Sequence, residues 1–459
     1  MSHRFAPAIL REYDIRGTVG RNLGTADAYA VGRGFATRVR GAGGTRVAVG
    51  RDGRLSSPEL EAALVEGLTA SGVDVVRIGL GPTPMLYYAE ATLEVDAGIQ
   101  VTGSHNPRDD NGFKMVLRHR SFYGADVQDL ARIAAAGDWP DGAGSVAEAD
   151  VLDAYVGRLF AGYAGGAYRI GWDCGNGAAG PAIERLTALL PGEHHLLFTE
   201  VDGGFPNHHP DPTEEHNLAD LKALVREKRL DFGIAFDGDG DRIGAVDGEG
   251  RVLWGDQLLS LLLPPVLSQL RGATVVADVK SSQLVFDRIA ELGGTAVMGA
   301  TGHSLMKEAM LAHHAPIAGE LSGHIFFGAG ANGGWYGCDD AIYAAVQLIR
   351  AVHLSGCSLT ELKSAMPPLV NTPDLRFAVD PARKFAVIDE VRERLEAAGT
   401  SVVAIDGVRV TTAEGWWLLR ASNTQDVLTA RAEAKDQSGL ERLLAAIDAA
   451  LVASGITRD

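Results

Sequence analysis

The sequence is poor in cysteine and has no long apolar segment. Cys174, Cys338 and Cys357 lie far apart and form no CxxC pair, so we expect reduced thiols in a cytoplasmic protein and no disulfide framework. The most apolar stretch, residues 258–267, contains a serine and two prolines and is too short to cross a bilayer. The N-terminal MSHRFAPAIL lacks the apolar core of a signal peptide. No membrane partner is therefore expected.

Positive charge is also scarce. The chain has 42 Lys and Arg residues against 59 Asp and Glu residues, for a formal net charge of −17. Proteins that bind nucleic acids or anionic membranes need clustered Lys and Arg to neutralise phosphates, so neither kind of partner is expected. A small anionic substrate needs only a few cations at one site, and that class of ligand stays open.

Apolar residues are abundant, at 46% of 459 residues, which is enough for several buried cores. Three apolar runs recur in the same order in three successive units, and each run ends at a polar loop rich in glycine. These runs are 46–54, 73–81 and 96–107, then 168–177, 194–202 and 231–242, then 274–282, 295–303 and 315–324. Helical segments such as 56–72, with a Ser-Pro start and a Gly end, lie between them. The pattern predicts three α/β domains with mixed or mostly parallel sheets, whose ligands bind beyond the carboxyl ends of the strands.

A different pattern follows the proline-rich segment 366–374. A helical segment at 384–399, a hairpin-like segment at 402–412 and a final helical segment at 438–455 predict a smaller α+β domain with an antiparallel sheet. The proline-rich segment would serve as its hinge. The predicted domains are residues 1–150, 151–255, 256–367 and 368–459.

The segment DGDGDR at 237–242 is the clearest candidate for a metal site. Asp237, Asp239 and Asp241 alternate with glycines after an apolar strand, and glycine lets a backbone fold around a small ion. Carboxylate oxygens suit Mg²⁺, which commonly leaves positions for water and a phosphate oxygen. An EF-hand loop is not predicted, because its sixth position would be Arg242 instead of glycine. The alternative is a polar turn, although crowded carboxylates repel each other unless a cation lies among them.

The segment TGSHNPRDDNGFK at 102–114 also follows a predicted strand. Ser104, at the carboxyl end of a parallel strand, is well placed to act as a nucleophile or phosphate carrier. His105 and Lys114 are available to orient a phosphate or to move a proton. The segment lacks the GxSxG pattern of a Ser-His-Asp hydrolase. Taken alone, SHNP is equally compatible with a tight turn.

Two further loops carry groups that suit a phosphorylated sugar. GELSGH at 319–324 offers the mixture of acceptors and donors that adjacent sugar hydroxyls need. RASNTQD at 420–426 offers a guanidinium and short polar side chains that suit a phosphate. Either loop could instead satisfy its own backbone. Arg16, Arg242 and Lys280 also lie at strand or loop ends, where a surface salt bridge is the alternative.

Taken in order, REYDIRG, VTGSHNP, DGDGDR, GELSGH and RASNT resemble the α-D-phosphohexomutase family over the whole chain, and most of all its bacterial phosphomannomutase/phosphoglucomutase group. Several motifs in one order are far more specific than any single motif. The resemblance implies four domains around a deep central cleft, in agreement with the three repeats and the smaller C-terminal domain.

The resemblance also implies roles for individual residues. Asp237, Asp239 and Asp241 would bind Mg²⁺ together with Ser104, which would carry the phosphoryl group. The implied catalytic residues are Ser104, His105, Lys114, Arg16 and Arg242, with Lys114, His105 and His324 as candidates for the general acid and base. The implied substrate-binding residues are Tyr13, Lys280, His303, Glu320, Ser322, His324, Arg420, Ser422, Asn423 and Thr424.

The implied reaction moves phosphate between C1 and C6 of a hexose through phospho-Ser104 and a hexose 1,6-bisphosphate. Glucose 1,6-bisphosphate would be the activator, and small sugar phosphates would be the ligands. Leu321, where glucosamine mutases usually have Gln, and His324 favour glucose and mannose phosphates. A phosphoglucosamine mutase, a phosphosugar phosphatase and a non-catalytic phosphosugar sensor stay as alternatives. The sequence predicts no oligomeric state.

Overall fold

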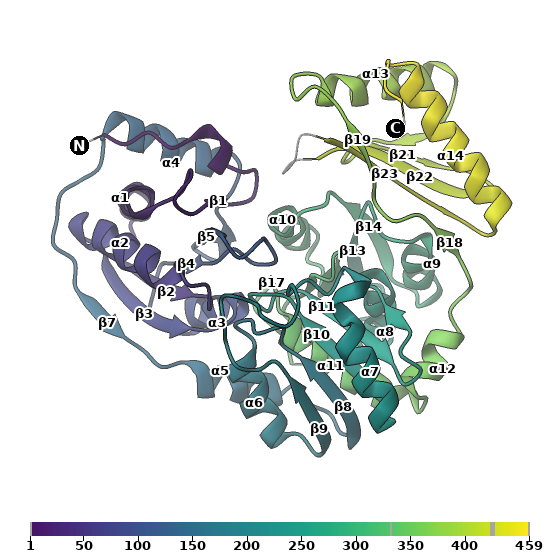
Figure 1. Cartoon of the computed structure of the whole chain (residues 1–459), viewed down its shortest axis with the longest axis horizontal. Coiled ribbons are helices and arrows are strands. Elements are labelled where there is room, and N and C mark those ends of the chain that lie inside the picture. Colours follow the sequence, from purple (N-terminus) through teal and green to yellow (C-terminus); the bar gives the residue numbers. More distant parts are fainter. Residues whose placement is uncertain (1, 331–332, 423–426, 458–459) are drawn as a thin grey trace.

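The computed structural model describes residues 2–330, 333–422 and 427–457. Four sheets follow one another along the chain, and Figure 1 shows the corresponding units arranged in an arc from the N-terminal to the C-terminal unit. The first three sheets mix parallel and antiparallel pairs, and the fourth is antiparallel in every pair. The predicted fold class is therefore confirmed. The predicted domain boundaries stay predictions.

The first sheet has the order β1-β5-β4-β2-β3-β7, with β6 paired to β5. Its central strands β4, β2 and β3 are parallel, and β5 returns antiparallel to β4. The strands are β1 (Ile15–Thr18), β2 (Arg46–Arg51), β3 (Asp74–Leu80), β4 (Ala97–Val101), β5 (Asp110–Leu117), β6 (Arg120–Ser121) and β7 (Val146–Glu148). The helices of this unit are α1 (Thr25–Gly41), α2 (Ser57–Ala70), α3 (Thr83–Thr92) and α4 (Ala125–Ala136). The helix predicted at 56–72 is α2.

The second and third sheets repeat this plan, with the orders β12-β11-β10-β8-β9 and β14-β13-β15-β16-β17. The second sheet contains β8 (Tyr168–Asp173), β9 (Gly192–Leu197), β10 (Phe232–Phe236), β11 (Ile243–Asp247) and β12 (Val252–Leu253). The third contains β13 (Thr274–Asp278), β14 (Thr295–Gly299), β15 (Ile317–Gly319), β16 (Ile325–Phe327) and β17 (Cys338–Asp339). The associated helices are α5 (Leu152–Phe160), α6 (Gly180–Leu189), α7 (Ala219–Lys228), α8 (Gly255–Leu267), α9 (Gln283–Glu291), α10 (His303–His313), α11 (Ala341–Ser355) and α12 (Leu359–Ser364).

The recurring apolar runs become equivalent strands in the three units. The first run of each unit forms β2, β8 or β13, and it pairs in parallel with both the second and the third run. The third run forms β4, β10 or β15, which are buried along their whole length, as expected for strands covered on both faces. A polar loop and an antiparallel strand follow each of them. The loops that carry Ser104, the three aspartates and Glu320 are therefore structurally equivalent.

The fourth sheet has the order β18-β23-β22-β21-β20, with β19 also paired to β23. Its strands are β18 (Val370–Asn371), β19 (Leu375–Ala378), β20 (Val402–Val403), β21 (Val408–Thr411), β22 (Gly415–Ala421) and β23 (Val427–Ala434), and its helices are α13 (Lys384–Ala397) and α14 (Gln437–Val452). This unit has a hydrophobic core of its own. In contrast, one continuous core joins α3, α5, α6, α8 and α11 across the first three units. A smaller cluster of Val279, Trp416 and Leu418 packs the fourth unit against the third.

Among the described residues, no helix combines the length and the apolar character that a membrane span requires.

Candidate active site

Ser104 follows the buried strand β4, and its side chain is itself buried. Its backbone has φ 50°, in the left-handed region that a non-glycine residue rarely adopts. Its Oγ donates to Asp237 Oδ2 at 3.0 Å and lies 3.2 Å from His105 Nδ1. The structure thus brings the predicted nucleophile of the first unit against the predicted metal loop of the second.

Asp237, Asp239 and Asp241 follow β10 and are fully buried. Each offers an oxygen within 4.8 Å of an oxygen of the other two, a cluster suited to metal binding. The loop also packs tightly on Ser104, because a Cβ on residue 238 would lie only 2.5 Å from the Ser104 carbonyl oxygen. Glycine is needed there for this close approach.

The carboxylates differ in their electrostatic surroundings. Burial raises the pKa of Asp237, and the charges of Asp241 and Asp239 raise that pKa further. Burial alone would also raise the pKa of Asp239, but the ammonium of Lys114 and the hydroxyls of Thr83 and Ser104 together outweigh burial and lower that pKa. Burial would lower the pKa of Lys114, but Asp239 and Asp241 outweigh burial and raise it. Lys114 is therefore held as a cation.

Lys114 and Arg16 are two of the cations that the first unit contributes. Lys114 lies on β5, and its Nζ is 2.8 Å from Asp239 Oδ2 and also contacts Asp241 Oδ2. Arg16 lies on β1, where it donates to Asp14 Oδ2 at 2.5 Å and to Asn106 Oδ1, in the Ser104 loop, at 2.8 Å. Lys114 thus contacts the aspartate loop of the second unit, and Arg16 contacts the Ser104 loop.

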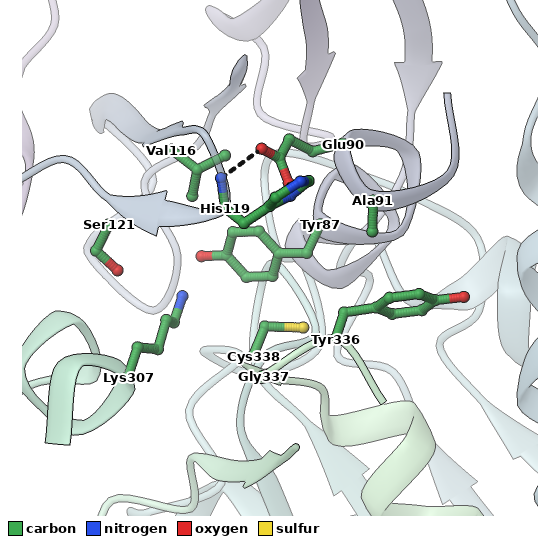
Figure 2. A pocket seen from close by; sticks show the side chains of 10 residues that line it. All are labelled: Tyr87, Glu90, Ala91, Val116, His119, Ser121, Lys307, Tyr336, Gly337 and Cys338. Atoms are coloured by element: carbon green, nitrogen blue, oxygen red, sulfur yellow. Dashed lines mark hydrogen bonds and ion pairs between the residues drawn. The ribbon is translucent and has the colours of Figure 1, made fainter. Parts of the chain in front are cut away.

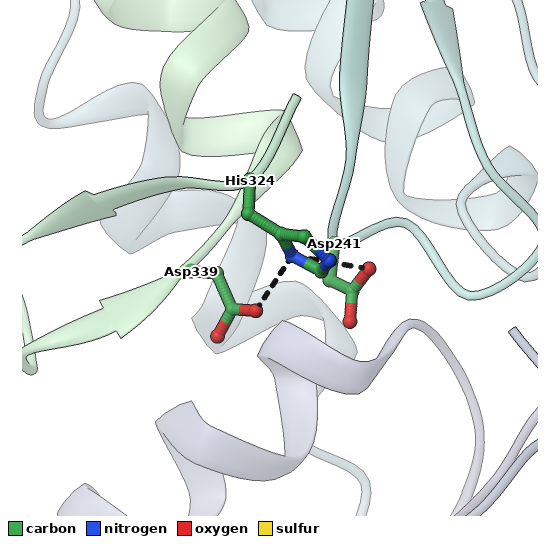
Figure 3. Close-up of side chains that lie close together, drawn as sticks. All are labelled: Asp241, His324 and Asp339. Carbon is green, nitrogen blue, oxygen red and sulfur yellow. Dashed lines mark ion pairs between the residues drawn. The ribbon is translucent and has the colours of Figure 1, made fainter. Parts of the chain in front are cut away.

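Arg242 and His324 join the second unit to the third. Their backbones form an isolated antiparallel bridge, and Arg242 Nε donates to His324 Nε2 at 2.9 Å. His324 Nδ1 faces the other way, 2.9 Å from Asp339 Oδ2 and 3.6 Å from Asp241 Oδ1, as Figure 3 shows. Sequence reasoning missed Asp339, because it lies on the two-residue strand β17, far from any of the motifs.

Lys307 of α10 forms an ion pair with Asp339. Its Nζ lies 2.8 Å from Asp339 Oδ1 and 3.9 Å from the centre of the Tyr87 ring. Burial would raise the pKa of Asp339, but Lys307 and His324 outweigh it and hold that pKa well below its usual range. Figure 2 shows Lys307 and Tyr87 lining a cavity of about 30 Å³ between α3 and α10. It has room for water but not for a sugar phosphate.

The predicted sugar loop lies between β15 and β16. Glu320 Oε1 accepts a hydrogen bond from the Gly302 amide at 2.5 Å, and Glu320 Oε2 accepts one from Ser322 Oγ at 3.1 Å. His303 begins α10, and its ring centre is 5.8 Å from that of His324 and 6.0 Å from that of Tyr13. Tyr13 Oη donates to the Thr301 carbonyl at 2.7 Å. These residues of the first and third units therefore lie side by side.

The predicted phosphate loop follows β22 in the fourth unit. Arg420 Nη2 lies 2.9 Å from Asp406 Oδ2, and the same oxygen accepts a hydrogen bond from the Thr301 amide at 3.2 Å. Lys280 pairs with Asp374, in the segment predicted as the hinge. Ser422 is buried and donates its amide to the Val427 carbonyl at 3.0 Å. Asn423 and Thr424 lie outside the described residues.

The contacts above link loops of all four units. Asp406 is a further residue that sequence reasoning missed, since its partners Arg420 and Thr301 lie 14 and 105 positions away. What the arrangement offers chemically is a buried serine hydroxyl beside a carboxylate cluster, cations around both, and hydrogen-bonding groups on the next loops. Such a set suits the transfer and binding of phosphate.

Comparison with known proteins agrees with this geometry. Four phosphoglucomutase/phosphomannomutase family models match consecutive parts of the chain: alpha/beta/alpha domain I at residues 7–139, domain II at 160–250, domain III at 254–369 and the C-terminal domain at 375–450. A phosphomannomutase/phosphoglucomutase of Pseudomonas aeruginosa is 41% identical, over 95% of this chain and 94% of the relative. A phosphoglucomutase of Neisseria gonorrhoeae is also 41% identical, over 95% of each chain.

A crystal structure of a phosphoglucomutase/phosphomannomutase family protein from Burkholderia thailandensis superimposes with a TM-score of 0.92, at 40% identity and over 98% of each chain. The four family models together cover most of the chain, and both relatives are 41% identical to it over nearly their whole length. The chain belongs to the phosphoglucomutase/phosphomannomutase family.

Proposed function

We propose that this enzyme, a phosphotransferase of the mutase type, interconverts hexose 1-phosphate and hexose 6-phosphate of glucose, mannose or both. Phospho-Ser104 gives its phosphoryl group to the free hydroxyl of the substrate, and the resulting 1,6-bisphosphate returns its other phosphate to Ser104. The observation that carries the proposal is the 3.0 Å contact between Ser104 Oγ and Asp237, inside a buried cluster of carboxylates and cations. Such a site can stabilise the charge of an in-line transfer.

The residues present fit Mg²⁺. Asp239 Oδ1 and Asp241 Oδ1 are buried without a hydrogen-bond partner, which leaves oxygen ligands of the kind that Mg²⁺ prefers. Phosphorylation of Ser104 would also add about two negative charges next to Asp237. Asp237, Asp239, Asp241 and the Ser104 oxygen would hold the ion. When bound, Mg²⁺ would neutralise charge on the transferring phosphoryl group.

The proton of the attacking sugar hydroxyl needs an acceptor, and His105 is the best placed of the three candidates. Burial lowers the pKa of His105 well below its usual value, and the charges of Arg242 and Arg16 lower it further. Its imidazole is thus neutral and lies 3.2 Å from Ser104 Oγ. Lys114, in contrast, is fixed as a cation between two carboxylates and serves better to hold phosphate and charge. Glu320 and Ser322 would bind the sugar hydroxyls.

The substrate assignment can be tested with three sugar phosphates. Purified enzyme should convert glucose 1-phosphate and mannose 1-phosphate to the 6-phosphates in a coupled assay with Mg²⁺ and catalytic glucose 1,6-bisphosphate, and should convert glucosamine 1-phosphate much more slowly. A clear preference for glucosamine 1-phosphate would contradict the glucose/mannose assignment. Steady release of inorganic phosphate would instead identify a phosphatase.

Arg420 is proposed to hold the phosphate that is not reacting. Arg420→Ala should raise KM for glucose 1-phosphate about 10- to 100-fold, because hydrogen bonds to charged groups contribute about 1.5–3 kcal/mol. It should also lower kcat through poorer positioning. Steady-state kinetics would measure both constants. Arg376→Ala, which removes an exposed arginine from β19 of the same sheet, is the matched control.

The second readout for Arg420 is metal binding. Because Arg420 and the aspartates lie on different units, Arg420→Ala should leave the Mg²⁺ concentration needed for half-maximal activity unchanged. If KM stayed normal while Mg²⁺ binding was lost, Arg420 would not be the phosphate-binding residue.

A further inference from the structure

The loop that carries Ser104 is held by the side chain of Arg54, which the proposed reaction does not use. Arg54 lies between β2 and α2, and its side chain is fully buried. Its Nη2 donates to the carbonyl oxygens of Ser104 and Asn106 at 2.6 and 2.7 Å. Its Nη1 donates to those of Pro107 and Asp110 at 2.6 and 2.8 Å. One guanidinium thus donates hydrogen bonds to four backbone carbonyls between Ser104 and Asp110.

The guanidinium also packs closely against Gly103 and the Phe205 ring. A Cβ on residue 103 would lie 2.5 Å from Arg54 Cζ, so only glycine lets the loop approach the guanidinium this closely. The Phe205 ring lies on Arg54 at 5.3 Å from its centre, within the range of a cation–π contact. The position of the guanidinium, and with it the positions of the four carbonyls, is therefore fixed.

Asp52 accepts hydrogen bonds from the same loop. Its Oδ2 accepts from Thr102 Oγ1 at 2.7 Å and from the Gly103 amide at 3.1 Å, and it lies 3.3 Å from Arg54 Nε. Thr102 Oγ1 in turn accepts from the Ser104 amide at 2.8 Å. Asp52 therefore binds the Thr102 hydroxyl and the Gly103 amide, and Arg54 binds the carbonyl oxygens from Ser104 onward. The two side chains form one buried ion pair under the loop.

We propose that Arg54 is a positioning residue that holds the Ser104 loop in the geometry required for phosphoryl transfer. This loop keeps Ser104 at φ 50°, a conformation that persists only where the surroundings enforce it. The serine must return to the same place after each half-reaction, and a shift of about 1 Å can cost about 100-fold in rate. The inference rests on the proposed function of Ser104.

The test is Arg54→Lys, which keeps the charge but has three donors on one flexible nitrogen and cannot serve four carbonyls in a plane. Turnover of glucose 1-phosphate should fall about 10- to 100-fold, whereas KM should change less than about threefold because the sugar and its distal phosphate bind other loops. Phosphorylation of Ser104 by glucose 1,6-bisphosphate, followed by intact mass, should slow to the same extent.

Arg33→Lys is the matched control. Arg33 is a buried arginine of the same unit that donates to Tyr29, Pro140 and Asp141, away from the Ser104 loop. It should lower thermal stability as Arg54→Lys does but keep kcat within about twofold. An Arg54→Lys enzyme with normal kcat, one altered only in KM, or an equal loss of kcat in Arg33→Lys would overturn the inference.

Thr102→Val tests the same support of the Ser104 loop if Arg54→Lys does not fold. It removes the hydroxyl that links Asp52 to the Ser104 amide with little change in shape, and it too should lower kcat with KM retained. Unchanged kcat in this variant would then count against the support. Ser104→Ala in parallel separates the two claims, because an active Ser104→Ala enzyme would remove the proposed function, not only the role of Arg54.

Discussion

Ser104→Ala is expected to reduce turnover of glucose 1-phosphate by several orders of magnitude while leaving the fold intact. Alanine removes the oxygen that would carry the phosphoryl group in both half-reactions, and binding of the substrate by other loops cannot replace a lost covalent intermediate. Ser104 is buried beside Asp237 and His105. Because alanine is smaller than serine, the substitution adds no bulk that would disturb this cluster. The coupled assay, with circular dichroism as the check on folding, measures the effect.

The control for this substitution is Ser71→Ala. Ser71 is fully buried in the same unit, and its hydroxyl has no hydrogen-bond partner there, so its removal should leave turnover unchanged. A Ser104→Ala enzyme that retained turnover comparable to Ser71→Ala would exclude Ser104 as the phosphate carrier.

Removal of the metal should have the second large effect. Excess chelator should abolish activity, and added Mg²⁺ should restore it. Asp239→Asn should lower turnover by about 100-fold or more, because the change keeps the shape but removes a charged ligand from a buried site, where electrostatic interactions are strongest. Asp239 also accepts hydrogen bonds from Lys114 and Thr83, which asparagine can keep only in part.

Asp247→Asn controls for the loss of a buried carboxylate. Asp247 lies on β11 of the same sheet, is fully buried and pairs with Arg251. This variant should lose stability but keep its Mg²⁺ dependence, whereas Asp239→Asn should need much more Mg²⁺ for what activity remains. Full activity of the unmodified enzyme in excess chelator would mean that the three aspartates have another role.

The repeat, its strands and the positions of the polar loops were predictable from the sequence because they depend on local patterns. An apolar run that ends at glycines marks a buried strand and the loop beyond it, and equivalent runs predict equivalent strands. The loops of Ser104, Asp237 and Glu320 were found in this way. Their placement in one site followed from the family resemblance and not from the pattern itself.

Contacts between distant side chains and backbone groups could not be predicted in this way. Arg54 acts on carbonyl oxygens about fifty positions away, and a carbonyl leaves no mark in a sequence. Lys114 was expected to orient a phosphate or move a proton, but its partners Asp239 and Asp241, 125 and 127 positions away, were not predicted. Asp339 and Asp406 lie outside every motif, and strand pairing within the third and fourth units brings them to His324 and Arg420.

The central claim, that phosphate passes through Ser104, is tested most directly by one turnover with labelled substrate. Enzyme that carries unlabelled phosphate on Ser104 is mixed with one equivalent of glucose 1-phosphate whose phosphate is radiolabelled. The unlabelled group should move to the C6 oxygen, and the labelled group at C1 should then move to Ser104. The predicted result is unlabelled glucose 6-phosphate and label on the peptide that contains Ser104. Label that remained in the glucose 6-phosphate, or appeared as inorganic phosphate, would contradict this account.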